Sequence, residues 1–242
     1  MAIKVKRTIT IGLGGTGCAA VLNVKRRLMR VYGQVPPMFN FLVLDTTQPK
    51  EMDERGQDVS LSDAEFLHLK VTDPTKIRKH REVDDWWTRV PAKAMTALTT
   101  GAKATRPLGR LSIFGNSKAV YAAIDRLFQE TRDDRMDRMA GDEFEVMPEL
   151  VVNLVGSVAG GTGSGTFMDI SFMIRSRLAA VDKLNAFVLL PDVFADKPAT
   201  TRVRPNSYGA LKEIDYFMSR SADDEYGYTL GGRSLEVPNG SV

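Results

Sequence analysis

Hydrophobic residues recur along this chain in patterns that predict strands followed by helices. An alternating stretch over Ile3–Leu13 predicts a strand, and a glycine-rich segment at residues 12–17 interrupts it before an amphipathic pattern predicts a helix over Cys18–Tyr32. The continuous apolar run Phe39–Leu44, which stops at Asp45, is typical of a strand buried on both faces of a parallel sheet. The chain therefore begins with the order strand, glycine turn, helix, strand.

The second half of the chain repeats this order. Leu150–Val155 predicts a buried strand, Gly156–Gly165 a glycine-rich turn, and Thr166–Leu178 a helix. Further predicted elements are a strand at Phe187–Leu190, a helix with a serine N-cap at Ser207–Ser219 and a hairpin at Tyr228–Val237. Strands that alternate with helices predict an α/β fold, with a Rossmann-like, mostly parallel sheet and helices on both faces. Ligands of such folds bind beyond the carboxyl ends of the strands.

The region between these two halves is less regular. Residues 50–100 carry a polar and broken pattern, and we expect an irregular, partly helical excursion there, with a helix over about Asp73–Trp87. A longer helical segment follows from about Pro107 to Met139, with an interruption near Gly115-Asn116. We therefore expect a single domain over residues 1–242.

Composition excludes several classes of protein. Of the 242 residues, 43% are hydrophobic and 26% are charged, as in an ordinary globular protein. No run approaches the roughly 18 apolar residues of a spanning helix and the start shows no signal peptide, so we expect a cytoplasmic protein without membrane insertion. One cysteine, Cys18, and two histidines cannot build an internal disulfide or a structural zinc site. A net charge of +3 is too small to indicate nucleic-acid binding.

Both glycine-rich turns are suited to binding phosphate. A glycine loop that leads into a helix presents free backbone N–H groups and the positive end of the helix dipole to one small volume. The first loop, Gly12-x-Gly14-x-x-Gly17, also matches the GxGxxG fingerprint of dinucleotide-binding folds. Neither loop contains the lysine of a P-loop, which excludes P-loop ATPases.

The second loop is more specific. Its sequence, Ala159-Gly160-Gly161-Thr162-Gly163-Ser164-Gly165, fits every position of the tubulin and FtsZ signature. The chain therefore resembles the nucleotide-binding domain of the tubulin/FtsZ superfamily, and among its members the divergent prokaryotic tubulin-like proteins. The resemblance extends from Ile9 to about Met218.

The resemblance implies a guanine nucleotide, GTP or GDP, with Mg²⁺. Asp45 matches the acidic residue that helps hold the hydrated magnesium ion. The segment 101–110 resembles the loop at the terminal phosphate, and Asp192 with Arg202 or Arg204 resembles the loop that reaches the ribose. The nucleotide-contacting residues implied in the glycine and terminal-phosphate loops are Gly12, Gly14, Gly15, Thr16, Gly17, Cys18, Gly101, Ala102, Lys103, Ala104, Thr105, Arg106, Ala159, Gly160, Gly161, Thr162, Gly163, Ser164 and Gly165.

The chain also departs from the family pattern. Lys103 and Thr105 replace a glycine and an asparagine of the terminal-phosphate loop, and Ala19 replaces an asparagine after the first loop. The family's central helix and the acidic loop that activates water would follow Val242, so the domain looks truncated. No catalytic residue is therefore assigned. Hydrolysis is expected only in a longer form that assembles as a head-to-tail homopolymer.

Several alternatives stay open. An NAD(P)- or FAD-dependent oxidoreductase would explain the first loop, although it needs only one pyrophosphate cradle, and a non-catalytic tubulin-like scaffold would explain both loops. Asp45 is as consistent with a structural turn as with a metal ligand. Arg106 is expected near the phosphates, whereas Cys18 fits a small packing residue near them.

Overall fold

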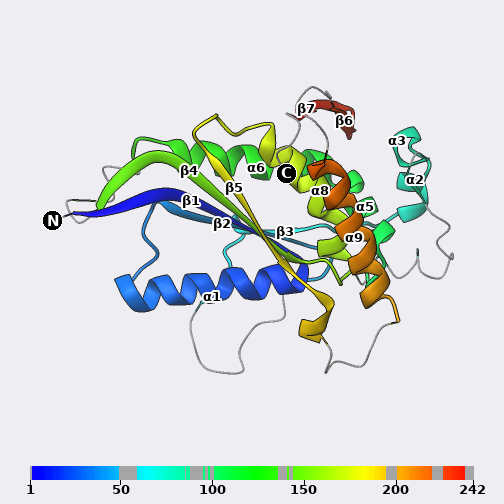
Figure 1. Ribbon diagram of the computed structural model, residues 1–242, viewed down its shortest axis with the longest axis horizontal. Coiled ribbons are helices and arrows are strands. Elements are labelled where there is room, and N and C mark those ends of the chain that lie inside the picture. Colours follow the sequence, from blue (N-terminus) through cyan, green and yellow to red (C-terminus); the bar gives the residue numbers. More distant parts are fainter. Residues whose placement is uncertain are drawn as a thin grey trace.

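A five-stranded parallel sheet forms the centre of the computed structural model (Figure 1). The structure describes residues 2–48, 59–84, 86–87, 95, 98, 101–135, 141, 144–194, 201–219 and 226–237. The strand order is β3-β2-β1-β4-β5. The strands are β1 (Ile3–Leu13), β2 (Phe39–Asp45), β3 (Phe66–His68), β4 (Phe144–Ser157) and β5 (Lys183–Leu189).

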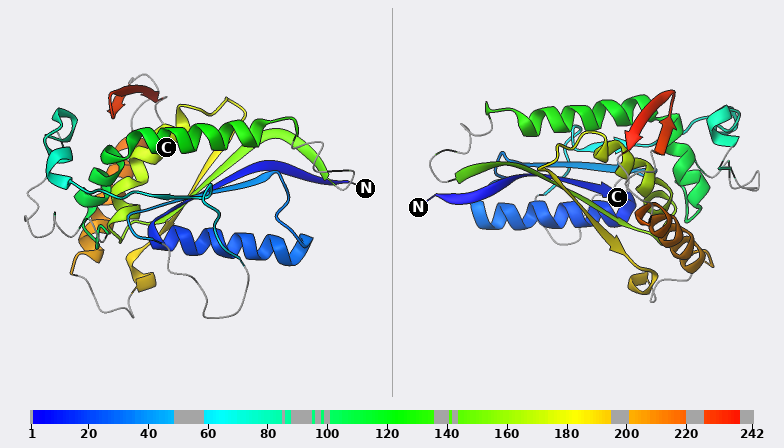
Figure 2. Two further views of the ribbon diagram at one scale, coloured as in Figure 1. Left: turned by 180° about the vertical axis from the view of Figure 1, so that it is seen from behind. Right: turned by 45° about the horizontal axis from the view of Figure 1, so that its top comes forward.

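Helices cover both faces of this sheet. Helix α1 (Gly14–Tyr32) lies on one face, while α6 (Ser117–Arg132) and α8 (Thr162–Arg175) lie on the other (Figures 1 and 2). Strand β2 shows how the sequence produces this arrangement, because successive side chains of a strand point to opposite faces. Phe41 and Val43 pack with α1, whereas Leu42 and Leu44 join the core beneath α6 and α8. The α/β fold with helices on both faces is confirmed.

Strand β4 contains a proline that its register accommodates. The pairing of β1 with β4 shifts between Lys6 and Arg7, so that Lys6 lies opposite Met147 and Arg7 opposite Leu150. Pro148 and Glu149 therefore have no partner on β1. Proline cannot donate a ladder hydrogen bond and is tolerated at such a bulge. This explains why the hydrophobic pattern reveals the strand only from Leu150 onward.

The remaining elements lie around the sheet. Helices α5 (Arg106–Gly115) and α9 (Val203–Met218) lie toward the carboxyl ends of the strands (Figure 2). The other described elements are α2 (Pro74–Arg78), α3 (Arg81–Asp84), the 3₁₀ turn η3 (Pro191–Phe194) and the hairpin β6 (Tyr226–Leu230) and β7 (Arg233–Val237). None of the described helices is long and apolar enough to span a membrane.

Several boundaries differ from those predicted. Helices α1 and α8 begin within the glycine loops, at Gly14 and Thr162, because residues of the loops also form the first helical turn. Helix α9 begins at Val203, and the Ser207 hydroxyl donates to the carbonyl oxygen of Val203, 3.0 Å away, so Ser207 is not an N-cap. Proline at position 205 fits the first turn, where backbone N–H groups have no helical partner.

The irregular region also differs. The helix predicted over 73–87 is two short helices, α2 and α3, separated at Lys79-His80. Strand β3 was not predicted, since three residues are too few to show a periodic pattern. The interruption near Gly115-Asn116 is confirmed by the break between α5 and α6, whereas Met136–Met139 lie outside the described residues.

We expect Gly12→Ala to destabilise the protein strongly. A Cβ on Gly12 would lie 2.5 Å from the carbonyl oxygen of Gly17 and 2.6 Å from its carbon, and both are backbone atoms that cannot move aside cheaply. Severe overpacking lowers the free energy of unfolding by about 3 kcal/mol. For a chain of this size, such a loss lowers the melting temperature by about 6–12 °C. The control is Gly160→Ala, whose Cβ would meet nothing within 4 Å. Equal melting temperatures of the two variants would contradict this account.

Candidate functional site

The carboxyl ends of three neighbouring strands meet around a small cavity. It has a volume of ≈220 Å³ and lies where β1, β2 and β4 end and where α1 and α8 begin. The residues that line it are Leu13, Gly14, Gly15, Thr16, Asp45, Thr46, Thr47, Ala102, Lys103, Ser157, Gly160, Gly161, Thr162 and Gly163. We call it the loop cavity.

Two helix N-termini contribute backbone donors to this cavity. Neither α1 nor α8 has a side-chain N-cap hydrogen bond, and neither has an acidic residue in its first turn. The first N–H groups of a helix have no partner within it, and the helix dipole adds positive potential there. The two starts also touch, because a Cβ on Gly14 would lie 3.3 Å from the nitrogen of Gly163. Together they form an anion-binding surface made of main chain.

The glycines of the two loops divide into two groups. At Gly17, Gly163 and Gly165 a Cβ would collide with backbone atoms, at 2.5, 2.7 and 2.3 Å respectively, so these residues are required for packing. Gly160 has nothing within 4 Å, and Gly15 has only the Oδ2 atom of Asp45 at 4.0 Å. Packing therefore does not explain Gly15 or Gly160, both of which line the loop cavity.

A chain of hydrogen bonds joins the loops beneath the cavity. The Thr162 hydroxyl donates to the Asp45 carboxylate at 3.2 Å, and it lies 2.7 Å from the Thr46 hydroxyl. Because each hydroxyl carries one proton, Thr46 donates to Thr162 and accepts in turn from the backbone N–H of Ala102 at 3.0 Å. Three segments that are remote in sequence are thus fixed to one another by buried side chains.

Asp45 is a buried carboxylate at the end of β2. One of its oxygens accepts from the N–H groups of Thr46 and Thr47, at 2.7 and 3.3 Å, as well as from Thr162. Burial nevertheless raises the pKa of Asp45, and these hydrogen bonds oppose the rise only in part. A cation beside this carboxylate would favour its charged form.

The loop that precedes α5 has an unusual backbone. Lys103 and Ala104 adopt positive φ angles of 42° and 56°, and Gly101 has a φ of 105°. A non-glycine residue in this region is uncommon and is held by its surroundings. Here the side-chain amide of Asn206, from α9, donates to the carbonyl oxygen of Ala104 at 2.9 Å. Lys103, which is exposed, lines the loop cavity.

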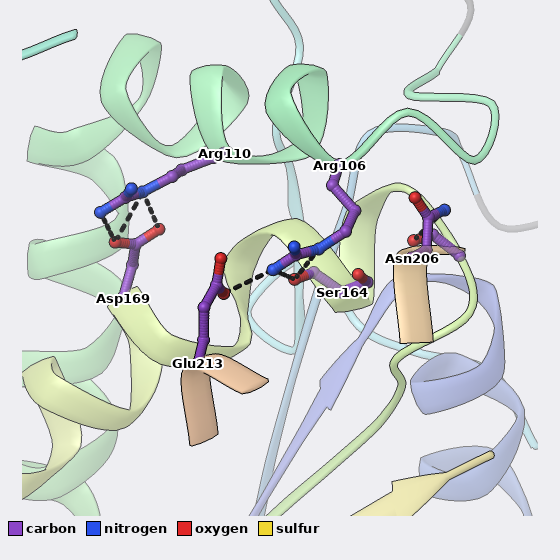
Figure 3. Close-up of polar contacts among 7 residues, drawn as sticks. Arg106, Arg110, Ser164, Asp169, Asn206 and Glu213 are labelled. Atoms are coloured by element: carbon purple, nitrogen blue, oxygen red, sulfur yellow. Dashed lines mark hydrogen bonds and ion pairs between the residues drawn. The ribbon is translucent and has the colours of Figure 1, made fainter. Parts of the chain in front are cut away.

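Some residues expected at the nucleotide do not line the loop cavity. Arg106 and Ser164 belong to a second cavity behind the loops, where the Arg106 guanidinium donates twice to the Ser164 carbonyl oxygen at 3.2 Å (Figure 3). Arg202 donates to the Thr105 hydroxyl. Cys18 packs in the core between α1 and β2, where burial raises the pKa of its thiol. The expected residues that do not line the loop cavity are Gly12, Gly17, Cys18, Gly101, Ala104, Thr105, Arg106, Ala159, Ser164, Gly165, Asp192, Arg202 and Arg204.

Four residues line the cavity although they were not among the expected site residues. They are Leu13, Thr46, Thr47 and Ser157. All four stand at or just after the last residues of β1, β2 or β4. The rule that ligands of parallel sheets bind at the carboxyl ends of the strands would have indicated them.

The site offers little to a metal ion by itself. Among the described residues no group of three His, Cys, Asp or Glu side chains could hold one. Asp45 is the acidic residue among those that line the loop cavity. Mg²⁺ is commonly held by one or two carboxylates together with substrate phosphates and waters. The residues present therefore fit a magnesium ion that arrives with a phosphate ligand.

Comparison with known proteins identifies the family. A family model described as tubulin like matches residues 9–237, and the chain therefore belongs to the tubulin-like family. CetZ from Methanosaeta thermophila strain DSM 6194 has a similar fold, with 14% identity and a TM-score of 0.52 over 90% of this chain and 48% of that one. CetZ1 from Haloferax volcanii, solved as a GDP-bound monomer, has 13% identity and a TM-score of 0.51 over 85% of this chain and 47% of that one. Curated protein sequences give no match.

The chain thus spans about half the length of these solved structures. At such identities the likeness concerns the fold. The expected membership of a tubulin-like family is confirmed.

Thr46→Val should loosen the loop at residues 101–105. The substitution keeps the shape of the side chain but leaves the Ala102 N–H without its acceptor, and an unsatisfied buried donor costs about 1–3 kcal/mol. We expect the Ala102 amide to exchange its hydrogen faster in Thr46→Val than in the wild type, as measured by NMR. Thr46→Ser keeps the hydroxyl and should preserve the protection of this amide. Equal protection in all three proteins would show that the hydroxyl does not hold the loop.

Asp45→Asn tests the electrostatics of the site. A carboxyl group whose pKa is raised by folding binds its proton more tightly in the folded state, so stability falls as pH rises from its ordinary value of 3.8 through the raised value. Asparagine can still accept the three hydrogen bonds but carries no charge. We expect the variant to lose this part of the pH dependence and to be at least as stable as the wild type at pH 7. Urea unfolding between pH 4 and 7 measures the difference, and a marked loss of stability at pH 7 would contradict the assignment.

Proposed function

We propose that this chain binds a guanine nucleotide, GTP or GDP, with its phosphates in the loop cavity. The observation that carries the proposal is the meeting of two uncapped helix N-termini, those of α1 and α8, at one cavity whose glycines 15 and 160 have no packing role. A volume of ≈220 Å³ is below that of a typical whole-ligand pocket. It suits the phosphate end of a nucleotide, with the ribose and base lying outside.

The choice of guanine rests on the family. The chain belongs to the tubulin-like family, and the similar CetZ1 structure is a GDP-bound one. The same membership favours a guanine nucleotide over the dinucleotide of an oxidoreductase. Asp192, Arg202 and Arg204 stand on the segments that follow β5, and we propose that they approach the ribose.

Charge within the cavity supports a triphosphate with magnesium. Lys103 supplies a cation where the backbone bends sharply, and Asp45 supplies one carboxylate to a hydrated Mg²⁺ ion. Asp45 would hold such an ion, and the ion would offset the negative charge of the phosphates. The Thr46 and Thr162 hydroxyls hold Asp45 and the loop at residue 102 in place whether or not the ion is there.

Hydrolysis is not assigned to this chain alone. Asp45 is the acidic residue lining the cavity, and it is engaged by three hydrogen-bond donors, so no described residue of the lining is positioned as a general base for water. We propose that residues 1–242 act as the nucleotide-binding domain of a longer protein, in which a neighbouring subunit of a head-to-tail homopolymer completes the catalytic site.

Gly160→Val tests nucleotide binding separately from folding. A side chain at this open position would occupy the space proposed for the phosphates, whereas no packed atom opposes it. We expect the melting temperature to stay within about 2 °C of the wild type, because substitutions without packing consequences are usually within 0.5 kcal/mol. Titration with fluorescent GTP in the presence of Mg²⁺ should show at least a tenfold weaker affinity.

The same titration with ATP and NAD provides the control. The wild type should prefer GTP. Tighter binding of NAD, or affinity for GTP that Gly160→Val leaves unchanged, would refute the proposal.

A further inference from the structure

A second and larger cavity lies behind the second glycine loop, residues 159–165. Its volume is ≈760 Å³, within the range of small-molecule pockets, and it opens between α5, α8 and α9 (Figure 3). The lining residues are Trp86, Arg106, Pro107, Arg110, Ser164, Gly165, Met168, Asp169, Phe172, Pro205, Asn206, Glu213, Tyr216 and Phe217. None of them lines the loop cavity. We call this space the rear cavity.

Aromatic rings form much of its wall. Phe172 of α8 meets Phe217 of α9 edge to face, with ring centroids 5.0 Å apart, and Tyr216 lies beside Phe217 at 5.1 Å. Trp86 adds an indole on the side of α5. Flat aromatic ligands gain stacked or edge-to-face contacts in such surroundings. The walls therefore favour a planar ring over a flexible chain.

Two arginines supply positive charge, and they differ in how firmly their partners are fixed. Arg110 pairs with Asp169, which is only 1% exposed, and its guanidinium lies 4.7 Å from the ring centre of Trp86. Arg106 pairs with Glu213, whose side chain is 48% exposed. An exposed ion pair contributes about 0–1 kcal/mol, so Glu213 can swing into solvent at little cost. Arg106 would stay in place, because it also donates to the Ser164 carbonyl oxygen.

Two further donors at this cavity lack acceptors. Within the described part of the chain, the Ser164 hydroxyl and the indole N–H of Trp86 are buried without a hydrogen-bond partner. Ser164 is 3% exposed, and both residues belong to the lining. A buried donor without an acceptor costs about 1–3 kcal/mol. Ligand oxygen atoms near them, after rotation of the side chains, would remove that cost.

We propose that the rear cavity is a binding site for a planar aromatic acid. The ring lies among Phe172, Tyr216 and Phe217, and the carboxylate replaces that of Glu213 on the Arg106 guanidinium. The same carboxylate can accept from the Ser164 hydroxyl. Arg106 and Asp169 thus have roles away from the nucleotide: one binds the anion, and the other fixes Arg110 against Trp86.

The test uses 1-naphthoate as the acid and 1-naphthalenemethanol as an uncharged probe with the same ring. Binding is measured by calorimetry on the full chain without nucleotide, so that failure of nucleotide binding does not affect the result. We expect naphthoate to bind at least threefold more tightly than the alcohol. Glu213→Gln should tighten naphthoate by about two- to fivefold, because a competing carboxylate worth up to about 1 kcal/mol is lost, and should leave the alcohol unchanged.

Two tyrosines of α9 give a matched pair of variants. Tyr216 lines the cavity and Tyr208 does not, and they are 56% and 67% exposed, so neither substitution removes a core residue. Tyr216→Ala should weaken both probes at least threefold, whereas Tyr208→Ala should change neither. Equal affinities of acid and alcohol, weaker naphthoate binding to Glu213→Gln, or equal effects of the two tyrosine variants would each overturn the proposal.

Discussion

Direct contact between segments of main chain is the constraint on which this structure depends. A Cβ on Gly109 would lie 2.1 Å from the Gly161 carbonyl oxygen, and one on Gly165 would lie 2.3 Å from that of Arg106. Helix α5 therefore lies directly against the start of α8 because neither position carries a side chain. The same holds where β1 meets α1, at Gly12 and Gly17. Backbone approach at these points brings the helix N-termini to one edge of the sheet.

Once the helix starts are this close, the N–H groups of their first turns, which have no acceptor within the helix, determine what the edge can bind. No acidic side chain caps α1 or α8, and the nearby carboxylate, Asp45, already accepts three hydrogen bonds. An anion is the group that such an edge lacks. The buried hydroxyls of Thr46 and Thr162 hold the loops in position without using these N–H groups. The threonine hydroxyls thus fix the loops, while the backbone N–H groups of the helix starts are left to bind an anion. The site is therefore preformed.

Sequence patterns predicted the sheet, its flanking helices and both glycine loops, because hydrophobic periodicity and glycine clusters are local signals. They could not predict which glycines line the cavity and which are required for packing. Gly160 and Gly165 belong to the same glycine loop, and only the fold shows that a Cβ would be accommodated at Gly160 and would collide with backbone at Gly165. Arg106 shows the same limit. Its position in the chain follows a loop that lines the loop cavity, but its side chain points toward Glu213, on a helix about a hundred residues later. Strand β3 was not predictable from a local pattern, because it is defined by its pairing with β2.

Helix α9 connects the two cavities physically. The side-chain amide of Asn206 donates to the Ala159 carbonyl oxygen at 3.0 Å and to that of Ala104 at 2.9 Å, so one residue holds two of the loops that surround the loop cavity. Two turns further along the same helix, Glu213 pairs with Arg106, which holds the Ser164 carbonyl oxygen. A displacement of α9 would therefore act on both loops through the carbonyl oxygens of Ala104, Ala159, Gly160 and Ser164. Helix α9 therefore holds the loops of one cavity and lines the other, so the two cavities share one element of the fold.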